Sequence, residues 1–185
     1  MSGHGSVEGS NKKVALLISV LALFLALAET LAKGAQTEAL SANVESTNQW
    51  AYFQARTIRG TILKTADETL ALIPPGSADP EAIKAKRAEW AKTLARWESD
   101  PASGDGRKEL QDKARASEGR RDLALHRYHQ YEFGSAAFQI GIVLASAQVI
   151  TGIVALAFLG GGLGVLGIAL LGFGFYAPHA LPFFH

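Results

Sequence analysis

Three side chains in the 185-residue sequence have the types and spacing of a metal site. Asp122, His126 and His129 are four and three residues apart, so a helix would present them on one face. A carboxylate with two imidazoles suits Zn²⁺ or another divalent cation. The same pattern also describes three polar residues on a solvated helix surface. Because no second group of ligands accompanies the two histidines, we favour the solvated surface and keep the metal site as a hypothesis.

No other pattern of reactive residues occurs. The sequence has no Gly-x-Ser-x-Gly nucleophile motif, and its Gly-rich stretch at 160–167 lacks the Lys-Ser/Thr pair of a phosphate loop. The absence of cysteine excludes disulfides, thiolate metal sites and cysteine nucleophiles. Acidic and basic residues alternate along the predicted helices, as solubilising charges do. We therefore predict a protein that is not an enzyme and that binds no cofactor.

The distribution of charge indicates the partners. The chain has 18 Lys and Arg residues and 17 Asp and Glu residues, and its formal net charge of +1 is too small to attract nucleic acid. Hydrophobic residues make up 48% of the sequence, and they gather at the two ends while the charged residues occupy the middle. This division predicts an integral membrane protein whose main partner is the lipid bilayer.

The apolar and charged stretches divide the chain into five segments. We expect a flexible Gly/Ser tail at 1–13, a transmembrane helix at 14–32 and a charged extramembrane helical domain at 33–132. A second transmembrane helix at 133–159 precedes a Gly-rich bend, a third membrane helix and an interfacial tail at 160–185. The predicted fold class is all-α, with three transmembrane or membrane-embedded helices and an extramembrane antiparallel hairpin or three-helix bundle.

The first apolar segment has two interpretations. The basic pair Lys12-Lys13 and the sequence Ala26-Leu27-Ala28 are typical of a cleaved signal peptide. A stripe of small residues at steps of four and three indicates instead a retained helix that packs on a neighbour, and we favour this second interpretation. The stripe consists of Ala15, Ser19, Ala22, Ala26 and Thr30.

Small residues also align on the two C-terminal apolar segments, where they would allow helices to approach closely. We expect the bend at Gly160, Gly161 and Gly162, and we expect Gln148 to form an interhelical hydrogen bond. The last apolar run, residues 163–176, is short for a full crossing and could be re-entrant. The aligned residues are Ala137, Gly141, Ala145, Gln148, Gly152 and Ala155 on the first segment and Gly160, Gly164, Gly167 and Gly174 on the second.

The charged middle has the pattern of three helices. Residues 34–73 predict one long helix, which Pro74-Pro75-Gly76 ends. Asp79-Pro80-Glu81 is a helix start, and a third helix begins near Arg107 and continues into the membrane segment. The apolar residues at helical spacing in the first of these helices are Leu40, Val44, Ala51, Ala55, Ile58, Ile62 and Ala66.

Large aromatic residues are concentrated in this charged middle. On the first of these helices, three aromatic residues within four positions cannot all lie on one face. On the second, two tryptophans form a narrow, coiled-coil-like apolar edge with Ile83 and Leu94. We interpret them mainly as core residues, with a partner-binding surface as the alternative. The residues are Trp50, Tyr52, Phe53, Trp90 and Trp97.

Three stretches of sequence resemble a known family. They are ETLAKGAQTEAL at 29–40, NQWAYFQARTIR at 48–59 and RYHQYEFGSAAFQIGIVLASAQVITG at 127–152. In these stretches the chain resembles an uncharacterised family of bacterial membrane proteins, catalogued as a domain of unknown function (DUF4337). The resemblance implies a retained membrane helix, a charged helical stretch and an apolar pair of helices. It implies no activity, cofactor or catalytic residue.

The location and the function remain hypotheses. We expect a multi-pass protein of the bacterial inner (plasma) membrane. Lys12 and Lys13 favour an external charged domain, whereas the arginines before the second membrane helix favour a cytoplasmic one, which we prefer. Our leading hypothesis is a non-enzymatic, self-associating scaffold or accessory subunit, either a homo-oligomer or bound to another membrane protein. The alternatives are a small oligomeric channel or carrier with Ser146, Gln148 and Thr151 in its pore, and a metal-dependent enzyme.

Overall fold

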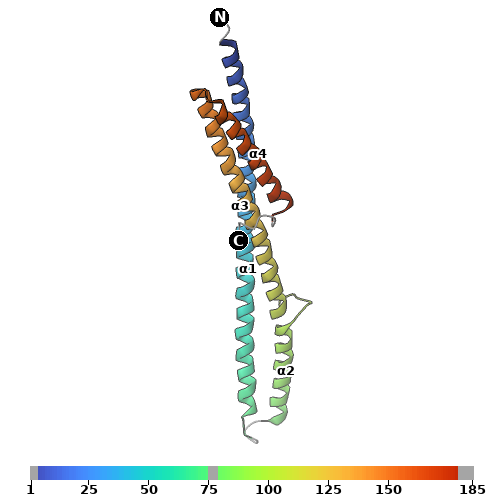
Figure 1. Ribbon diagram of the computed structural model, residues 1–185. Helices are drawn as coiled ribbons and strands as arrows, with labels where there is room; N and C mark the ends of the chain where they lie inside the picture. The colour runs from blue at the N-terminus through green and yellow to red at the C-terminus, as the bar shows by residue number, and fades with distance from the viewer. Residues whose placement is uncertain (1–3, 75–78, 179–185) are drawn as a thin grey trace. The chain divides into compact units, whose positions relative to one another are not determined.

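Helices make up nearly all of the described chain. The computed structural model describes residues 4–74 and 79–178, and within these ranges it contains four α-helices and no strand (Figure 1). This confirms the all-α fold class. The chain forms two compact units, which we call the apolar unit (Met1–Leu40 with Arg121–His185) and the charged unit (Ser41–Arg120). The helices are α1 (His4–Ala71), α2 (Pro80–Glu98), α3 (Arg107–Thr151) and α4 (Val154–Tyr176).

Helix α1 joins two segments that the sequence analysis separated. No proline interrupts it, and it ends at Ala71, three residues before the Pro74-Pro75 pair that disfavours helical backbone. It begins at His4, so residues 4–13 are helical and the expected tail is wrong for this stretch. The physical reason is that adding a residue to an existing helix costs far less than starting a new one. Residues 1–3 lie outside the described part of the chain.

Helix α2 begins as its sequence predicts. The Asp79 side chain accepts a hydrogen bond of 3.1 Å from the backbone N–H of Glu81, and Pro80 occupies the first helical position, where its missing N–H costs nothing. The helix ends at Glu98, and the backbone N–H of Ser99 donates back to the carbonyl of Ala95 at 3.1 Å. Both ends of α2 are therefore fixed by local hydrogen bonds.

The turn between α3 and α4 lies at residues 152–153, and the bend expected at Gly160, Gly161 and Gly162 is wrong. Gly152 has a φ of 75°, a left-handed conformation that glycine adopts without steric cost, and it ends α3. The three later glycines lie inside α4. This helix has 23 residues, which is long enough to cross a membrane, so the third apolar segment is not the short one expected.

The apolar unit combines a small core with an apolar exterior. Phe138 is fully buried at its centre, where its ring stacks on Phe24 with centroids 5.8 Å apart. By length and composition, α1, α3 and α4 each contain a stretch apolar enough to span a membrane. Large apolar side chains such as Leu23, Ile150 and Phe158 are exposed on the outside of this unit. The remaining core residues are Leu21, Ala28, Ala32, Ala35, Tyr131 and Leu171.

The charged unit is an antiparallel hairpin. One arm is the second half of α1, and the returning arm is α2 followed by the start of α3, which lie one after the other along α1 in Figure 1. Arg87 on α2 pairs with Asp67 at 2.7 Å, and further along Arg120 on α3 pairs with Glu45 at 2.6 Å. Loop residues 99–106 interrupt the returning arm. Of the two predicted arrangements, the contacts therefore favour the hairpin.

Gly152→Ala tests the turn. A Cβ at residue 152 would meet nothing within 4 Å, so the cost arises only from the positive φ, and we expect a loss of about 1–2 kcal/mol in the free energy of unfolding. Gly172→Ala is the matched control, because this helical glycine also has open space, and here we expect a gain of about 0.5–1 kcal/mol. Thermal unfolding in detergent, followed by circular dichroism, measures both; equal effects would contradict the assigned turn.

Candidate functional site and helix-packing surfaces

The structure does not bring Asp122, His126 and His129 together as a metal site. Asp122 accepts from the Arg121 guanidinium, with Nη2 2.8 Å from Oδ1, and His129 Nδ1 lies 3.8 Å from Glu132 Oε2. His126 is half-buried. Within residues 4–74 and 79–178, no group of three or more His, Cys, Asp or Glu side chains could hold a metal ion. A shared helix face was therefore insufficient, because two of the three side chains turn to charged neighbours.

Backbone contact between α3 and α4 centres on two glycines. A Cβ placed on Gly160 would lie 2.6 Å from the carbonyl oxygen of Gly141, and a Cβ on Gly141 would lie 2.9 Å from that of Gly160. Ala145, one turn along α3, is completely buried, and its backbone nitrogen would lie 3.4 Å from the same Gly160 Cβ. The two helices therefore touch through their backbones, as small residues in membrane helices permit.

Three other α4 glycines make room for large side chains of the same unit. Gly164 lies against Leu21, and Gly167 lies under the Phe138 ring, where an added Cβ would come within 2.7 Å of ring carbons. Gly174 lies in the same way against the Tyr131 ring. The small-residue stripes expected on α3 and α4 are thus used inside the chain. The exceptions are Gly152, which forms the turn, and Ala155, which is exposed at the start of α4.

The small-residue stripe of α1 has no such use within the apolar unit. Ser19, Ala22 and Ala26 are exposed, as are Ala15 and Thr30 at the two ends of the stripe. The stripe's hydroxyl groups bind the helix's own backbone, Ser19 to the Ala15 carbonyl at 3.0 Å and Thr30 to the Ala26 carbonyl at 2.8 Å. The residues that α1 buries in this unit are Val14, Leu21, Ala28, Ala32, Ala35 and Ala39. The face chosen from the sequence is therefore an outer face.

Of the three residues expected to line a pore, two form hydrogen bonds with the backbone of their own helix and the third is buried. The Ser146 hydroxyl donates to the Ile142 carbonyl at 2.8 Å, and the Thr151 hydroxyl donates to the Ala147 carbonyl at 2.9 Å. Gln148 is only 4% exposed, and its Oε1 atom has no hydrogen-bond partner among the described residues. It does not form the interhelical hydrogen bond expected of it.

Gln130 is a packing residue that the sequence analysis missed. Its side chain is completely buried, and its Nε2 atom donates to the carbonyl of Pro178 at 2.7 Å, which ties α3 to the chain just after α4. The available signal was the position of this amide among aromatic residues, with Tyr128 before it and Tyr131 after it. It was missed because a polar residue ahead of the apolar segment was counted with the charged domain. The predicted interfacial tail at 179–185 lies outside the described residues.

The aromatic residues of the charged unit divide between core and surface. Trp50 Nε1 donates to Glu118 Oε1 at 2.8 Å, and its ring meets Phe53 edge to face with centroids 5.4 Å apart. Trp90 and Trp97 on α2 are half-buried, next to the cations of Lys86 and Arg56 respectively. Tyr52 is exposed. Trp50 and Phe53 thus join the two arms, whereas Tyr52 faces outward.

A row of apolar residues on α1 also faces outward in the charged unit. We call it the exposed seam; it contains Val44, Ala51, Ile58 and Ile62, spaced by seven, seven and four residues. The three larger side chains are 59%, 60% and 64% exposed. The arm contacts of α1 instead use residues between them, such as the buried Ser46 and the half-buried Phe53. Heptad-type spacing is what a helix uses to pack on another helix.

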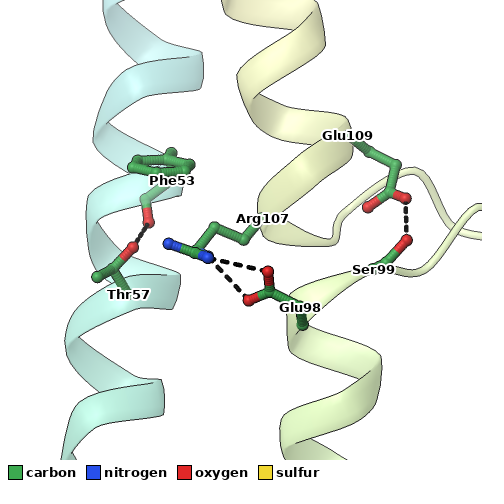
Figure 2. Close-up of polar contacts among 6 residues, drawn as sticks. All are labelled: Phe53, Thr57, Glu98, Ser99, Arg107 and Glu109. Carbon is green, nitrogen blue, oxygen red and sulfur yellow. Dashed lines mark hydrogen bonds and ion pairs between the residues drawn. The ribbon is translucent and has the colours of Figure 1, made fainter.

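An ion pair and a carboxylate fix the junction of α2 and α3 (Figure 2). Arg107 donates from Nε and Nη2 to the two Glu98 oxygens, both at 2.9 Å, and its guanidinium lies 5.5 Å from the Phe53 ring centroid. This bidentate hydrogen bonding lowers the pKa of Glu98 and raises that of Arg107. Glu109 accepts from the Ser99 hydroxyl at 2.6 Å, which lowers the pKa of Glu109.

Two cavities of the charged unit are lined largely by charged side chains. One, of about 360 Å³, is lined by Arg56, Lys64, Trp97 and Glu98 among others, and a second, of about 560 Å³, by Arg59 and Lys113 among others. Their cations are in part already bound, since Lys113 donates to the Gly104 carbonyl at 2.7 Å and Arg107 to Glu98. The two threonine hydroxyls of the first lining donate to backbone carbonyls, Thr57 to Phe53 at 2.9 Å and Thr61 to Thr57 at 3.0 Å, so neither is hydrogen-bonded to a side-chain base.

Comparison with known families identifies a match over most of the chain. A family model described as Domain of unknown function (DUF4337) matches residues 10–177. The match covers α2, α3 and α4 completely and most of α1. No curated protein and no solved structure matches the chain.

Gly160→Ala tests the α3–α4 contact. The added methyl group would meet the Gly141 carbonyl, so the helices must separate, and we expect a loss of about 1–3 kcal/mol in stability. Gly161→Ala is the control, because its Cβ meets nothing within 4 Å. Thermal unfolding in detergent compares the two variants. An unchanged midpoint for Gly160→Ala would show that the helices do not touch there.

Glu98→Gln tests the junction. We expect a loss of about 0.5–1 kcal/mol near pH 7, the value of a partly exposed ion pair. Because the pKa of Glu98 is lowered in the folded state, its stabilising contribution is present above the ordinary glutamate pKa of about 4.3 and is lost as the pH falls through the lowered value. Denaturation curves of wild type and variant should therefore converge below about pH 4. Glu68→Gln, at an exposed position of α1, should have little effect near pH 7; a similar loss there would refute the assignment.

Proposed function

This chain belongs to the family described as Domain of unknown function (DUF4337), and we propose that it is a non-enzymatic, self-associating membrane protein. It acts as a scaffold or accessory subunit of a membrane assembly. The observation that carries this proposal is the exposed seam of the charged unit. Among the described residues, no group of three or more His, Cys, Asp or Glu side chains could hold a metal ion, which leaves the surfaces as the features to explain.

Membrane insertion accounts for the exterior of the apolar unit. Side chains such as Leu23, Ile150 and Phe158 would expose a large apolar area to water, whereas lipid accepts them without cost. The lengths and compositions of α1, α3 and α4 suit three crossings. We place the protein in a bacterial inner membrane with the charged unit on the cytoplasmic side, where the arginines that precede the second apolar segment are favoured.

Self-association accounts for the exposed seam. The charged unit is rich in ion pairs, and an exposed row of Val and Ile is unexpected on a surface in contact with water. Val44, Ile58 and Ile62 are 59%, 60% and 64% exposed, so covering each of them with a second helix contributes about 1–2 kcal/mol and favours association along this row. The heptad-type spacing favours a helical partner, and a second copy of this chain supplies an identical row.

The small-residue stripe of α1 supports the same conclusion inside the membrane. Lipid offers no hydrophobic reason for helices to associate, so close backbone approach must hold them. The buried glycines of α4 and Gly141 of α3 already serve contacts within the chain, whereas Ser19, Ala22 and Ala26 are exposed. This stripe is suited to contact with another chain, either a second copy or another membrane protein.

The double variant Ile58→Gln, Ile62→Gln tests the proposal. Native mass spectrometry of the full-length protein, released from detergent or nanodiscs, gives the number of chains in each complex. We expect an oligomer for wild type and at least a roughly tenfold weaker association for the variant, because the seam loses two large apolar contacts. Glutamine favours a helix at least as well as isoleucine, so α1 should remain intact.

The control is Asn43→Gln, Thr61→Gln. It introduces the same residue type at exposed positions of α1 that lie off the seam. Association of the control variant should match wild type. A wild-type protein that is strictly monomeric in both environments, with no second protein bound, would overturn the proposal.

A further inference from the structure

A cavity in the apolar unit contains a buried amide with an unused oxygen. The cavity has a volume of about 480 Å³, within the roughly 300–1,000 Å³ range of small-molecule sites, and it lies among α1, α3 and α4. Its lining includes Lys13, Leu17, Gln148, Ala157, Phe158 and Gly161. Lys13 and Gln148 are the only polar side chains in the described lining. A site of this kind, largely apolar with two polar groups, suits an amphiphile.

Gln148 needs a hydrogen-bond donor that the described chain does not supply. Its side chain is 96% buried, and Oε1 has no partner. The nearby hydroxyls of Ser146 and Thr151 donate to backbone carbonyls of α3, and the α4 residues of the lining have no side-chain donors. A buried acceptor without a donor is costly, so an occupant with a hydroxyl or N–H group would be favoured.

Lys13 adds a positive charge at the end of the first apolar stretch. Its side chain is exposed, and the uninterrupted apolar sequence begins with the next residue, Val14. In a membrane this position corresponds to the headgroup region, where lysine meets phosphate. The α3–α4 turn at residues 152–153 closely follows Gln148 in sequence, which also places the amide near the membrane surface.

We propose that this cavity binds an anionic phospholipid with a hydroxylated headgroup. Lys13 pairs with the phosphate, Gln148 Oε1 accepts a hydrogen bond from a headgroup hydroxyl, and one acyl chain lies against Leu17, Ala157 and Gly161. The lack of a side chain at Gly161 leaves space for the chain, since a Cβ there would meet nothing within 4 Å. The inference rests on the membrane insertion that is part of the proposed function.

Native mass spectrometry with defined lipids tests this inference. The full-length protein is titrated with phosphatidylglycerol and, separately, with phosphatidylcholine of the same acyl chains, which has neither net charge nor a headgroup donor. We expect one phosphatidylglycerol per chain, bound roughly ten times more tightly than phosphatidylcholine. Gln148→Leu should remove most of this preference by weakening phosphatidylglycerol binding, and Lys13→Gln should weaken the binding of both lipids, because each contains a phosphate.

Two controls separate binding from folding. Gln148→Leu should keep or raise the unfolding temperature, because it removes an unsatisfied buried amide, and Ser146→Ala should bind lipid as wild type does. Equal affinity for the two lipids, or unchanged binding by Gln148→Leu, would overturn the inference while leaving self-association intact. The same spectra report the number of chains in each complex, so failure of the proposed function would be seen separately as a monomer. Failure to float with liposomes would overturn both.

Discussion

The close contact between Gly141 and Gly160 is the constraint on which the apolar unit depends. With carbonyl oxygens so near the opposing α-carbons, α3 and α4 can lie together only if both positions lack a side chain. That approach brings Gly167 under the Phe138 ring and Gly174 against Tyr131, so that large residues of α3 fill the spaces left by glycines of α4. Packing of this kind holds helices together where surrounding lipid offers no hydrophobic driving force.

The same contact explains why the helices were easier to predict than the turn between them. Periodicity and apolar length were sufficient for α1, α3 and α4, and the Asp79-Pro80 signal was sufficient for the start of α2. The turn was not, because a glycine that allows close approach and a glycine that allows a positive φ are identical in sequence. Gly160, Gly161 and Gly162 were more conspicuous, yet of these four glycines it is Gly152 that has a positive φ.

For the candidate sites, the sequence indicated which residues share a face and left open what that face meets. The buried glycines of α3 and α4 contact their own chain, whereas the stripe on α1 faces outward. Gln148 lines a cavity, and its Oε1 atom accepts no hydrogen bond from a described residue. Asp122, His126 and His129 share a face as well, but their neighbours Arg121 and Glu132 decide where two of them turn. Such choices depend on tertiary contacts, which helical spacing alone does not encode.

The surfaces that make no contact within their own unit are the ones that support self-association. Each unit secures its internal contacts by different means, glycine packing in one and ion pairs with aromatics in the other. The two surfaces without such contacts both lie on α1: the small-residue stripe and the exposed seam. In lipid, helices associate by close backbone approach, which the exposed small residues of the apolar part of α1 permit. In water, they associate by burying apolar side chains, which Val and Ile on the charged part of α1 provide. Helix α1 is therefore suited to helix partners in both environments.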